Sequence, residues 1–504
     1  MPPSLRRSTW LLLLAVFFAG IAQIAVLPPF EGYDEIAHFS SIQQIADTGR
    51  IPLYGRDRLS ADIAAYPGPM AAAEGQPYRD AARVDISAAG PTHFAPGRSY
   101  NWEAQHPPLY YLLMSLPYRA FASFSWRWHM FALRSASWAV AFAGFAWGAV
   151  LAQRLLLRHG VTDARLLLPA LWPFLFPEFF PEFARLTNDS LCILLVACAW
   201  WLALGWLQRG DSWVRAVALG VTLGAGLLTK AFFLPITVGV GALLAVAAAR
   251  GSRRWPVAAL APVLAILIGG AWYLAKLRMT GSFTGSADLI ELQAHGGLLH
   301  GLRAHFSAWQ YLRGIGGIVA GFCWAGTWSF VQPSRLYWVP MMALAVLPPA
   351  LYVWRARRWT LAALTPVFFV APVLAGLLYH QLAMVAETGA GNGTPGWYLH
   401  MFAGPLACVL VLGWAGRGVM LPLLAYAGAF FVAVNAMQLA FFSGCLPRTG
   451  LGKVSLVESV RCLGALAPLH RVALPDIAAP VAAVAVVALL AACVLAAPRQ
   501  AGSG

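Results

Sequence analysis

Acidic and imidazole side chains gather in one short stretch near the start of the chain. The sequence PPFEGYDEIAHF, residues 28–39, places Glu31, Asp34, Glu35 and His38 within eight positions. A carboxylate can act as a general base where its surroundings raise its pKa toward the working pH. The same pattern also fits the start of a helix, with an aspartate as N-cap and a glutamate in the first turn. The two interpretations are compatible.

A second titratable pair precedes a later helix. The stretch EAQHPPLYYLL, residues 103–113, contains Glu103 and His106 ahead of two prolines and two tyrosines, the first of which is Tyr110. Prolines suit the first turn of a helix, and tyrosines suit a membrane interface. That structural account leaves Glu103 and His106 unexplained.

A third cluster lies in PEFFPEFARLTNDSL, residues 177–191, where Glu178 and Glu182 are one helical turn apart and Asp189 precedes an apolar run. Charges at the edge of an apolar segment are costly unless they are paired or functional. Asp189 is explained either as a cap of the next helix or as a group that orients a substrate. Lys230 lies in an otherwise apolar turn, either as an interfacial anchor or as a cation for a phosphate.

The composition places these clusters in a membrane protein. Of 504 residues, 60% are hydrophobic and 11% are charged, and the mean hydropathy is +0.66. Soluble proteins carry about 25% charged residues. Apolar runs of spanning length recur along the chain, and helices satisfy the backbone in lipid. We therefore predict an all-α polytopic membrane protein with 11–13 transmembrane helices. The net charge of +15 comes largely from arginines in short turns, which anchor the cytoplasmic side, and it does not indicate nucleic acid.

We expect spans near residues 8–27, 107–123, 131–152, 165–180, 190–207, 214–229, 231–249, 256–275, 337–354, 360–379, 397–414, 418–441 and 478–497. Placing the arginine clusters inside puts the polar segments 28–106 and 276–336 on the outer face. One conflict remains, because full crossings by both 107–123 and 131–152 would put the basic residues 153–165 outside. One of the two is then re-entrant, or the charge rule fails there.

Three parts follow from this pattern: a transmembrane module 1–275 that includes the first outer loop, an outer loop 276–336, and a C-terminal transmembrane module 337–504. In the first loop, Ile36, Phe39, Ile42 and Ile45 recur at helical spacing, which predicts an amphipathic helix on the outer membrane surface. Residues 8–27 are expected to be a retained first helix. Cys445 and Cys462 share a polar segment and either pair as a disulfide or remain free thiols.

The motifs together resemble those of the GT-C superfamily of membrane glycosyltransferases. Asp34-Glu35 after the first helix, HPPLYY at 106–111 and Asn188-Asp189 carry the resemblance. DEIAH at 34–38 and GWYLHMFAGP at 396–405 look most like a bacterial family of predicted membrane proteins within that superfamily. Protein mannosyltransferases and the aminoarabinose transferase of lipid A are more distant likenesses.

The resemblance implies transfer of a sugar from a polyprenyl-phosphate carrier to an extracytoplasmic glycan, lipid or protein, with inversion, at a bacterial inner membrane. Asp34 is then the expected base, with Glu35 second. The resemblance assigns substrate contacts to His38, His106, Tyr110, Asp189, Trp397 and Tyr398. That bacterial family usually has an arginine where this chain has Trp397, so Lys230, Arg303 or Arg313 is expected to hold the donor phosphate.

The prediction includes no certain cofactor. A divalent cation, Mg²⁺ or Mn²⁺, is compatible with the chemistry, although Asp34 and His38 alone make a weak metal site. Two other classes of function stay open at this point. One is a transporter or flippase of lipid-linked sugars, which would use ionisable groups near mid-membrane. The other is a catalytically degenerate partner in an assembly.

Overall fold

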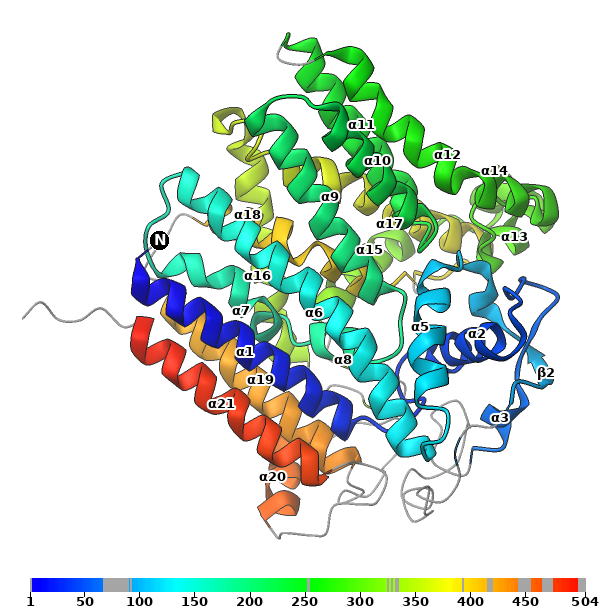
Figure 1. Cartoon of the computed structure of the whole chain (residues 1–504), viewed down its shortest axis with the longest axis horizontal. Coiled ribbons are helices and arrows are strands. Elements are labelled where there is room, and N and C mark those ends of the chain that lie inside the picture. Colours follow the sequence, from blue (N-terminus) through cyan, green and yellow to red (C-terminus); the bar gives the residue numbers. More distant parts are fainter. Residues whose placement is uncertain are drawn as a thin grey trace, which may run out of the picture.

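The computed structural model describes residues 2–66, 90, 93–251, 254–323, 326–327, 330, 335–391, 394–414, 420–442, 455–464 and 475–496. Nearly all regular structure in these ranges is helical, as Figure 1 shows. Six helices are long and apolar enough to cross a membrane, and six more apolar helices are shorter. The chain is an all-α polytopic membrane protein, as predicted.

The helices that meet the spanning criterion are α1 (Pro3–Val26), α6 (Trp126–Arg158), α9 (Asp189–Arg209), α12 (Trp255–Thr280), α17 (Thr365–Thr388) and α19 (Met420–Phe442). The shorter apolar helices are η2 (Ala164–Leu167) continued by α7 (Leu168–Leu175), α10 (Trp213–Leu227), α11 (Phe233–Ala249), α16 (Arg335–Trp354), η4 (Trp397–Phe402) continued by α18 (Ala403–Gly413), and α21 (Pro475–Ala496). The remaining helices are α2 (Glu35–Thr48), α3 (Ala61–Ala64), η1 (Trp102–Gln105), α5 (Leu109–Ala120), α8 (Phe179–Ala184), α13 (Ala287–Ala294), α14 (Gly297–His305), α15 (Ala308–Cys323), η3 (Ala356–Arg358) and α20 (Leu456–Gly464).

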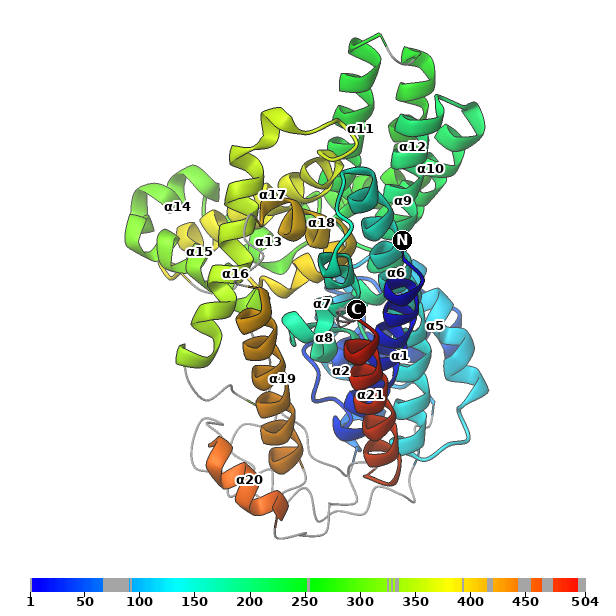
Figure 2. The same cartoon turned by 90° about the vertical axis from the view of Figure 1, so that its left-hand side faces the viewer.

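The two ends of the chain pack together. Figure 1 and Figure 2 both show α1 beside α21, and the Ser8 hydroxyl donates a hydrogen bond to the Ala492 carbonyl at 3.0 Å. On the other side of α1, a glycine allows α6 to approach closely. A Cβ atom added at Gly20 would lie 2.1 Å from the Trp138 ring, so no larger residue fits there. A long apolar core thus joins the first, sixth and last helices.

The helix α5 resolves the topological conflict of the sequence. It has 12 residues, which at 1.5 Å per residue reach only about 18 Å, well short of the hydrocarbon thickness. The predicted span 107–123 was therefore wrong. Tyr111 and Tyr118 of α5 pack with Phe39 of α2 in a core separate from the main one. A single crossing by α6 is consistent with an inner location of the basic residues that follow it, as the charge rule predicts.

Two other expected segments are interrupted. In place of the predicted span 165–180, the chain forms η2, α7 and α8, with a break between Leu175 and Phe179. The expected outer loop 276–336 contains three helices, α13, α14 and α15.

The predicted helix of the first loop is present as α2, but it does not lie free on a surface. Every residue from Glu35 to Ala46 is buried. Gln43 donates to Asp62 at 2.7 Å, and the Ser40 hydroxyl accepts from the Ser60 backbone N–H at 2.8 Å. Its polar face is thus covered by the region of the two short antiparallel strands β1 (Arg58–Ser60) and β2 (Pro96–Tyr100), which pair Arg58 with Tyr100.

One of the two cysteines suggested to pair, Cys462, lies in α20. Cys462 is disulfide-bonded, whereas Cys445 lies outside the described residues. In Figure 2, α20 lies beyond the end of α19.

Candidate active site

The turn that leads from α1 into α2 has an uncommon backbone. Phe30 and Asp34 are left-handed, with φ of 65° and 58°, and they are the only non-glycine residues with positive φ in the described part of the chain. Aspartate tolerates this conformation better than most residues, but phenylalanine does not. Such backbone persists only where the surroundings impose it, and it is common at functional sites.

A buried arginine imposes this turn. The Arg134 guanidinium donates from Nε to Glu35 Oε1 at 2.7 Å and also to the backbone carbonyls of Leu27 and Pro28. The Leu186 backbone N–H donates to the same Glu35 oxygen at 2.9 Å. Because Glu35 is completely buried and holds three elements together, the geometry favours a structural role for it.

Asp34 has a different environment from its neighbour. It occupies the N-cap position of α2, yet its side chain does not cap the helix. Instead, Trp102 Nε1 of η1 donates to Asp34 Oδ1 at 2.9 Å. Burial raises the pKa of this half-buried carboxyl, and the negative charge of Glu103 raises it further, while Arg185 and the Trp102 hydrogen bond oppose the shift. A carboxylate with a raised pKa and no ion pair suits a general base.

The second predicted pair lies next to Asp34. His106 Nε2 is 2.9 Å from Glu103 Oε2, and His38 Nε2 is 3.6 Å from the same oxygen. Burial alone would raise the pKa of Glu103, but the two neighbouring imidazoles, the hydrogen bond from His106 and the charge of Lys230 together lower it. Burial lowers the pKa of His38 to about 3, so its ring is neutral, and its Nδ1 is hydrogen-bonded to the Tyr111 hydroxyl at 3.0 Å. Residues far apart in sequence thus form one network.

The third cluster and the isolated lysine also meet. Lys230 Nζ lies 2.6 Å from Asp189 Oδ2, and both side chains are buried. The ammonium also lies 4.4 Å from the ring centre of Tyr398, a cation–π contact. Asp189 is therefore a partner of Lys230, and neither its side chain nor that of Asn188 caps α9.

Aromatic rings connect this ion pair to Asp34. Tyr33, next to Asp34, stacks on Trp397 with ring centres 4.9 Å apart and planes 7° apart. Trp397 in turn precedes Tyr398, which packs on Lys230. The flat face of the Trp397 ring thus lies against the Tyr33 ring at this site.

A second cation reaches the same region. Arg185 NH2 donates to Glu182 Oε2 at 2.6 Å, and NH1 donates to the Tyr33 backbone carbonyl. A Cβ atom on Gly32 would lie 2.4 Å from Arg185 Cβ, so glycine is required for this approach. Arg185 was not among the predicted site residues, although its position three residues after Glu182 was a visible signal.

Several polar atoms in this region are buried without a hydrogen-bond partner in the described structure: Glu178 Oε1, Arg185 Nε and both polar atoms of the Asn188 side chain. Buried polar groups are paired in the great majority of cases, so a local group of exceptions needs an explanation. A polar ligand between these side chains would satisfy them.

Three predicted site residues lie apart from this cluster or inside the core. Tyr110 is buried, and its hydroxyl contacts Ser137 of α6 at 2.9 Å and accepts from the Thr187 backbone, which ties α5 to α6 and to the segment before α9. Arg303 of α14 and Arg313 of α15 are exposed. No interaction among the described residues connects either arginine with Asp34 or Lys230.

Two functional neighbours were missed in the sequence, Trp102 and Arg134. Arg134 falls inside the predicted apolar span 131–152, where a lone arginine was a signal that was not used. Across the described part of the chain, no group of three or more His, Cys, Asp or Glu side chains is arranged to hold a metal ion.

No protein-family model matches this sequence, and no match was found among curated proteins. Solved structures with a similar fold include ArnT from Cupriavidus metallidurans bound to undecaprenyl phosphate, at 14% identity and a TM-score of 0.48, covering 96% of this chain and 76% of that one. They also include an oligosaccharyltransferase from Archaeoglobus fulgidus with an acceptor peptide, at 15% identity and a TM-score of 0.39, covering 97% of this chain and 56% of that one. At such low similarity, no residue role is taken from them.

Proposed function

We propose that the chain is an integral membrane glycosyltransferase that moves a sugar from a polyprenyl-phosphate carrier to an acceptor hydroxyl. The observation that carries the proposal is the state of Asp34. The half-buried Asp34 carboxylate accepts a hydrogen bond from Trp102. The Glu35 and Asp189 carboxylates instead form ion pairs, with Arg134 and Lys230 respectively.

Asp34 acts as the base in this proposal. It takes the proton of the acceptor hydroxyl while the acceptor oxygen attacks the anomeric carbon. The bond from that carbon to the phosphate oxygen breaks in the same displacement, which inverts the anomeric centre. General bases of this kind contribute about 10²- to 10⁴-fold to the rate. The network of His38, Glu103 and His106 positions the acceptor.

The departing polyprenyl phosphate needs no strong general acid, because phosphate is a good leaving group. Lys230 and Arg185 stabilise its charge as it develops. Both cations are already paired with carboxylates, Asp189 and Glu182, so they are held in place before the donor binds. The buried unpaired atoms around Asn188 support binding of the sugar hydroxyls. We place this site on the extracytoplasmic face of a bacterial inner membrane.

The test compares purified wild-type protein with Asp34→Asn in proteoliposomes that contain radiolabelled polyprenyl-phosphate sugars. The expected result is transfer by the wild type and a loss of at least about 100-fold in the variant. Asp47→Asn is the matched control, because Asp47 is an exposed aspartate of the same helix. It removes the same charge and should leave transfer unchanged.

Transfer that persists in Asp34→Asn would overturn the assignment of the base. A wild type that binds the lipid donor and moves it between leaflets without transfer would favour a flippase. Binding with neither transfer nor movement would favour a degenerate assembly partner.

A further inference from the structure

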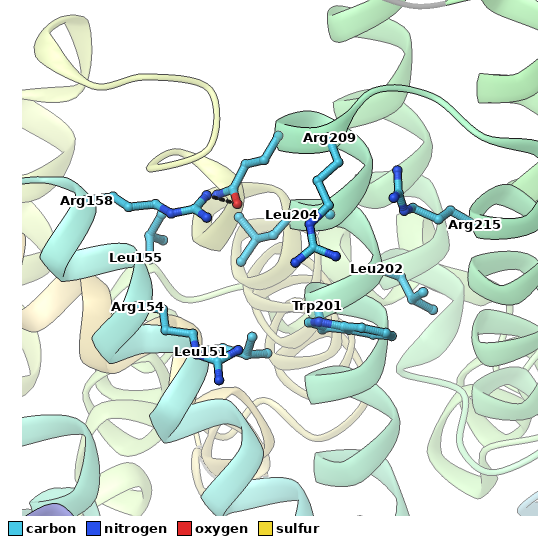
Figure 3. A pocket seen from close by; sticks show the side chains of 11 residues that line it. Leu151, Arg154, Leu155, Arg158, Trp201, Leu202, Leu204, Arg209 and Arg215 are labelled. Carbon is cyan, nitrogen blue, oxygen red and sulfur yellow. Dashed lines mark hydrogen bonds between the residues drawn. The ribbon is translucent and has the colours of Figure 1, made fainter. Parts of the chain in front are cut away.

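A cavity of about 140 Å³ opens between α6, α9 and the start of α10, far from the cluster around Asp34. Figure 3 shows arginine side chains around it and leucines and a tryptophan along its wall. The lining residues that matter here are Arg154, Arg158, Arg209, Arg215, Leu151 and Trp201.

No acidic partner of the four arginines lies in the part of the chain that the structure describes. Within the described ranges, none of them forms an ion pair, and Arg158 donates to the neutral Gln208 side chain. Arg215 donates to the Gly210 backbone carbonyl at 2.9 Å. Asp211 lies between two of the arginines in sequence, but it pairs with Arg254 at 2.8 Å instead. Four positive charges around one cavity therefore remain uncompensated within the described protein.

The position of the cavity separates it from the proposed transfer site. The helix α9 begins with Asp189 and ends with Arg209, and its 21 residues at 1.5 Å each span about 30 Å. The helix α6 also extends from one site to the other. Arg134 in its first part contacts Glu35, and Arg154 and Arg158 in its last part line the cavity. About 30 Å is the thickness of the hydrocarbon layer, so the cavity lies at the opposite membrane surface.

The lining selects a ligand with a phosphate and an apolar part. Guanidinium groups bind phosphate oxygens through paired hydrogen bonds. The exposed Trp201 and the leucines beside the arginines offer apolar surface next to the charge, as at other sites for lipid headgroups between transmembrane helices. We propose that this cavity binds the phosphate headgroup of an anionic membrane lipid, with the acyl chains against α6 and α9.

The simpler explanation is general attraction of basic turns to an anionic leaflet. That attraction requires no cavity and depends only on the number of charges. The cavity contains a further feature, because a Cβ atom added at Gly205 would have Arg215 Cδ and Nε as its nearest neighbours, both at 3.9 Å. A larger side chain at Gly205 would fill space between the arginines and leave every charge in place.

The test measures binding of dioleoyl phosphatidylglycerol to the full-length protein in detergent by native mass spectrometry, with phosphatidylcholine as the neutral lipid. The variants are Arg154→Gln/Arg158→Gln and Gly205→Leu. The matched control is Arg357→Gln/Arg358→Gln, which removes two exposed arginines of η3 outside the cavity. Inorganic phosphate is titrated as a competitor, and thermal unfolding without added lipid checks that each variant is folded.

Each arginine near a membrane surface contributes roughly fivefold to binding of anionic lipid, so the double cavity variant should bind about 30-fold more weakly. Gly205→Leu should also weaken binding, and the η3 control should bind as the wild type does. Equal losses in the cavity variant and the control would overturn the proposal in favour of diffuse charge. Wild-type binding in Gly205→Leu, or displacement of the lipid by millimolar inorganic phosphate, would overturn it as well.

Discussion

Glu35 and Arg134 form a completely buried ion pair that joins α2 to α6, although 99 positions separate them in the sequence. The pair also fixes the backbone of the turn that presents Asp34, because Arg134 holds the carbonyls of Leu27 and Pro28. Two adjacent carboxylates thus have different partners: Glu35 is paired with Arg134, whereas Asp34 accepts a hydrogen bond from Trp102.

Breaking this pair should unfold the turn. Glu35→Gln leaves Arg134 buried without a counter-charge, and removal of one partner of a buried pair costs about 3–5 kcal/mol. We expect a clear fall in the thermal midpoint of the detergent-solubilised protein. The double variant Glu35→Leu/Arg134→Met should recover part of that loss, since it leaves no unpaired charge. A Glu35→Gln protein with wild-type stability and no transfer would instead indicate that Glu35 takes part in the chemistry.

Asp34→Asn should lose transfer activity without losing stability. In the folded protein, burial raises the pKa of Asp34 above its unfolded value. Between the two values the folded state holds more protons than the unfolded state, so stability falls as the pH rises. At pH 7 the wild type carries the full cost of a half-buried charge, which Asn does not have.

Asp34→Asn should therefore melt at the same temperature as the wild type or higher at pH 7. Its advantage should vanish below the unfolded pKa of aspartate. Asn also tolerates the left-handed backbone and can accept the Trp102 hydrogen bond. Thermal unfolding from pH 3 to pH 8 checks this, and a variant that is less stable at pH 7 would contradict it.

Trp102 should set the pH at which the base works. Its indole N–H stabilises the ionised form of Asp34, so Trp102→Phe should raise the pKa of this carboxyl further. Because only the ionised base is active, the acid limb of kcat/KM should move to higher pH, with a plateau near the wild-type level above it. Trp213→Phe, an exposed tryptophan of α10, is the control. A lowered plateau with an unmoved limb would mean that Trp102 serves packing alone.

Lys230 and Asp189 should respond differently to substitution if the lysine holds the donor. Lys230→Gln removes a charged contact to phosphate, worth about 1.5–3 kcal/mol, and should weaken polyprenyl-phosphate binding roughly 10- to 100-fold. Asp189→Asn keeps the cation and releases it from its partner, so the lipid should bind at least as tightly while the protein loses stability. Equal losses of binding in both variants would indicate that the Lys230–Asp189 pair is only structural and that Lys230 does not bind the phosphate. Lipid binding by native mass spectrometry and thermal unfolding measure the two effects.

Much of the architecture followed from local pattern. The length of the apolar runs predicted a polytopic helical protein, and the spacing of Ile36, Phe39 and Ile42 predicted α2. The distribution of arginines conflicted with full crossings by both 107–123 and 131–152, which left either a re-entrant segment or a failure of the charge rule. These features depend on the solubility of each segment in lipid and on helical periodicity, which the sequence encodes residue by residue.

The sequence indicated which segments contribute to the candidate site, but it did not indicate that these segments meet. Asp34, His38, Glu103 and His106 were each noticed separately, and their contact depends on α2 packing against η1 and α5. The burial of Tyr110 and the exposure of Arg303 were not accessible from residue type.

The sequence by itself determined that this is a helical membrane protein with acidic residues at the ends of its apolar segments. Only the tertiary structure decided which of those acids is neutralised. The cation that pairs with each acid comes from a distant part of the chain. Lys230 and Asp189 are 41 positions apart in the sequence, and Arg134 and Glu35 are 99 apart. A buried carboxylate takes the nearest cation because an unpaired charge costs several kcal/mol, and no local pattern specifies which cation that is.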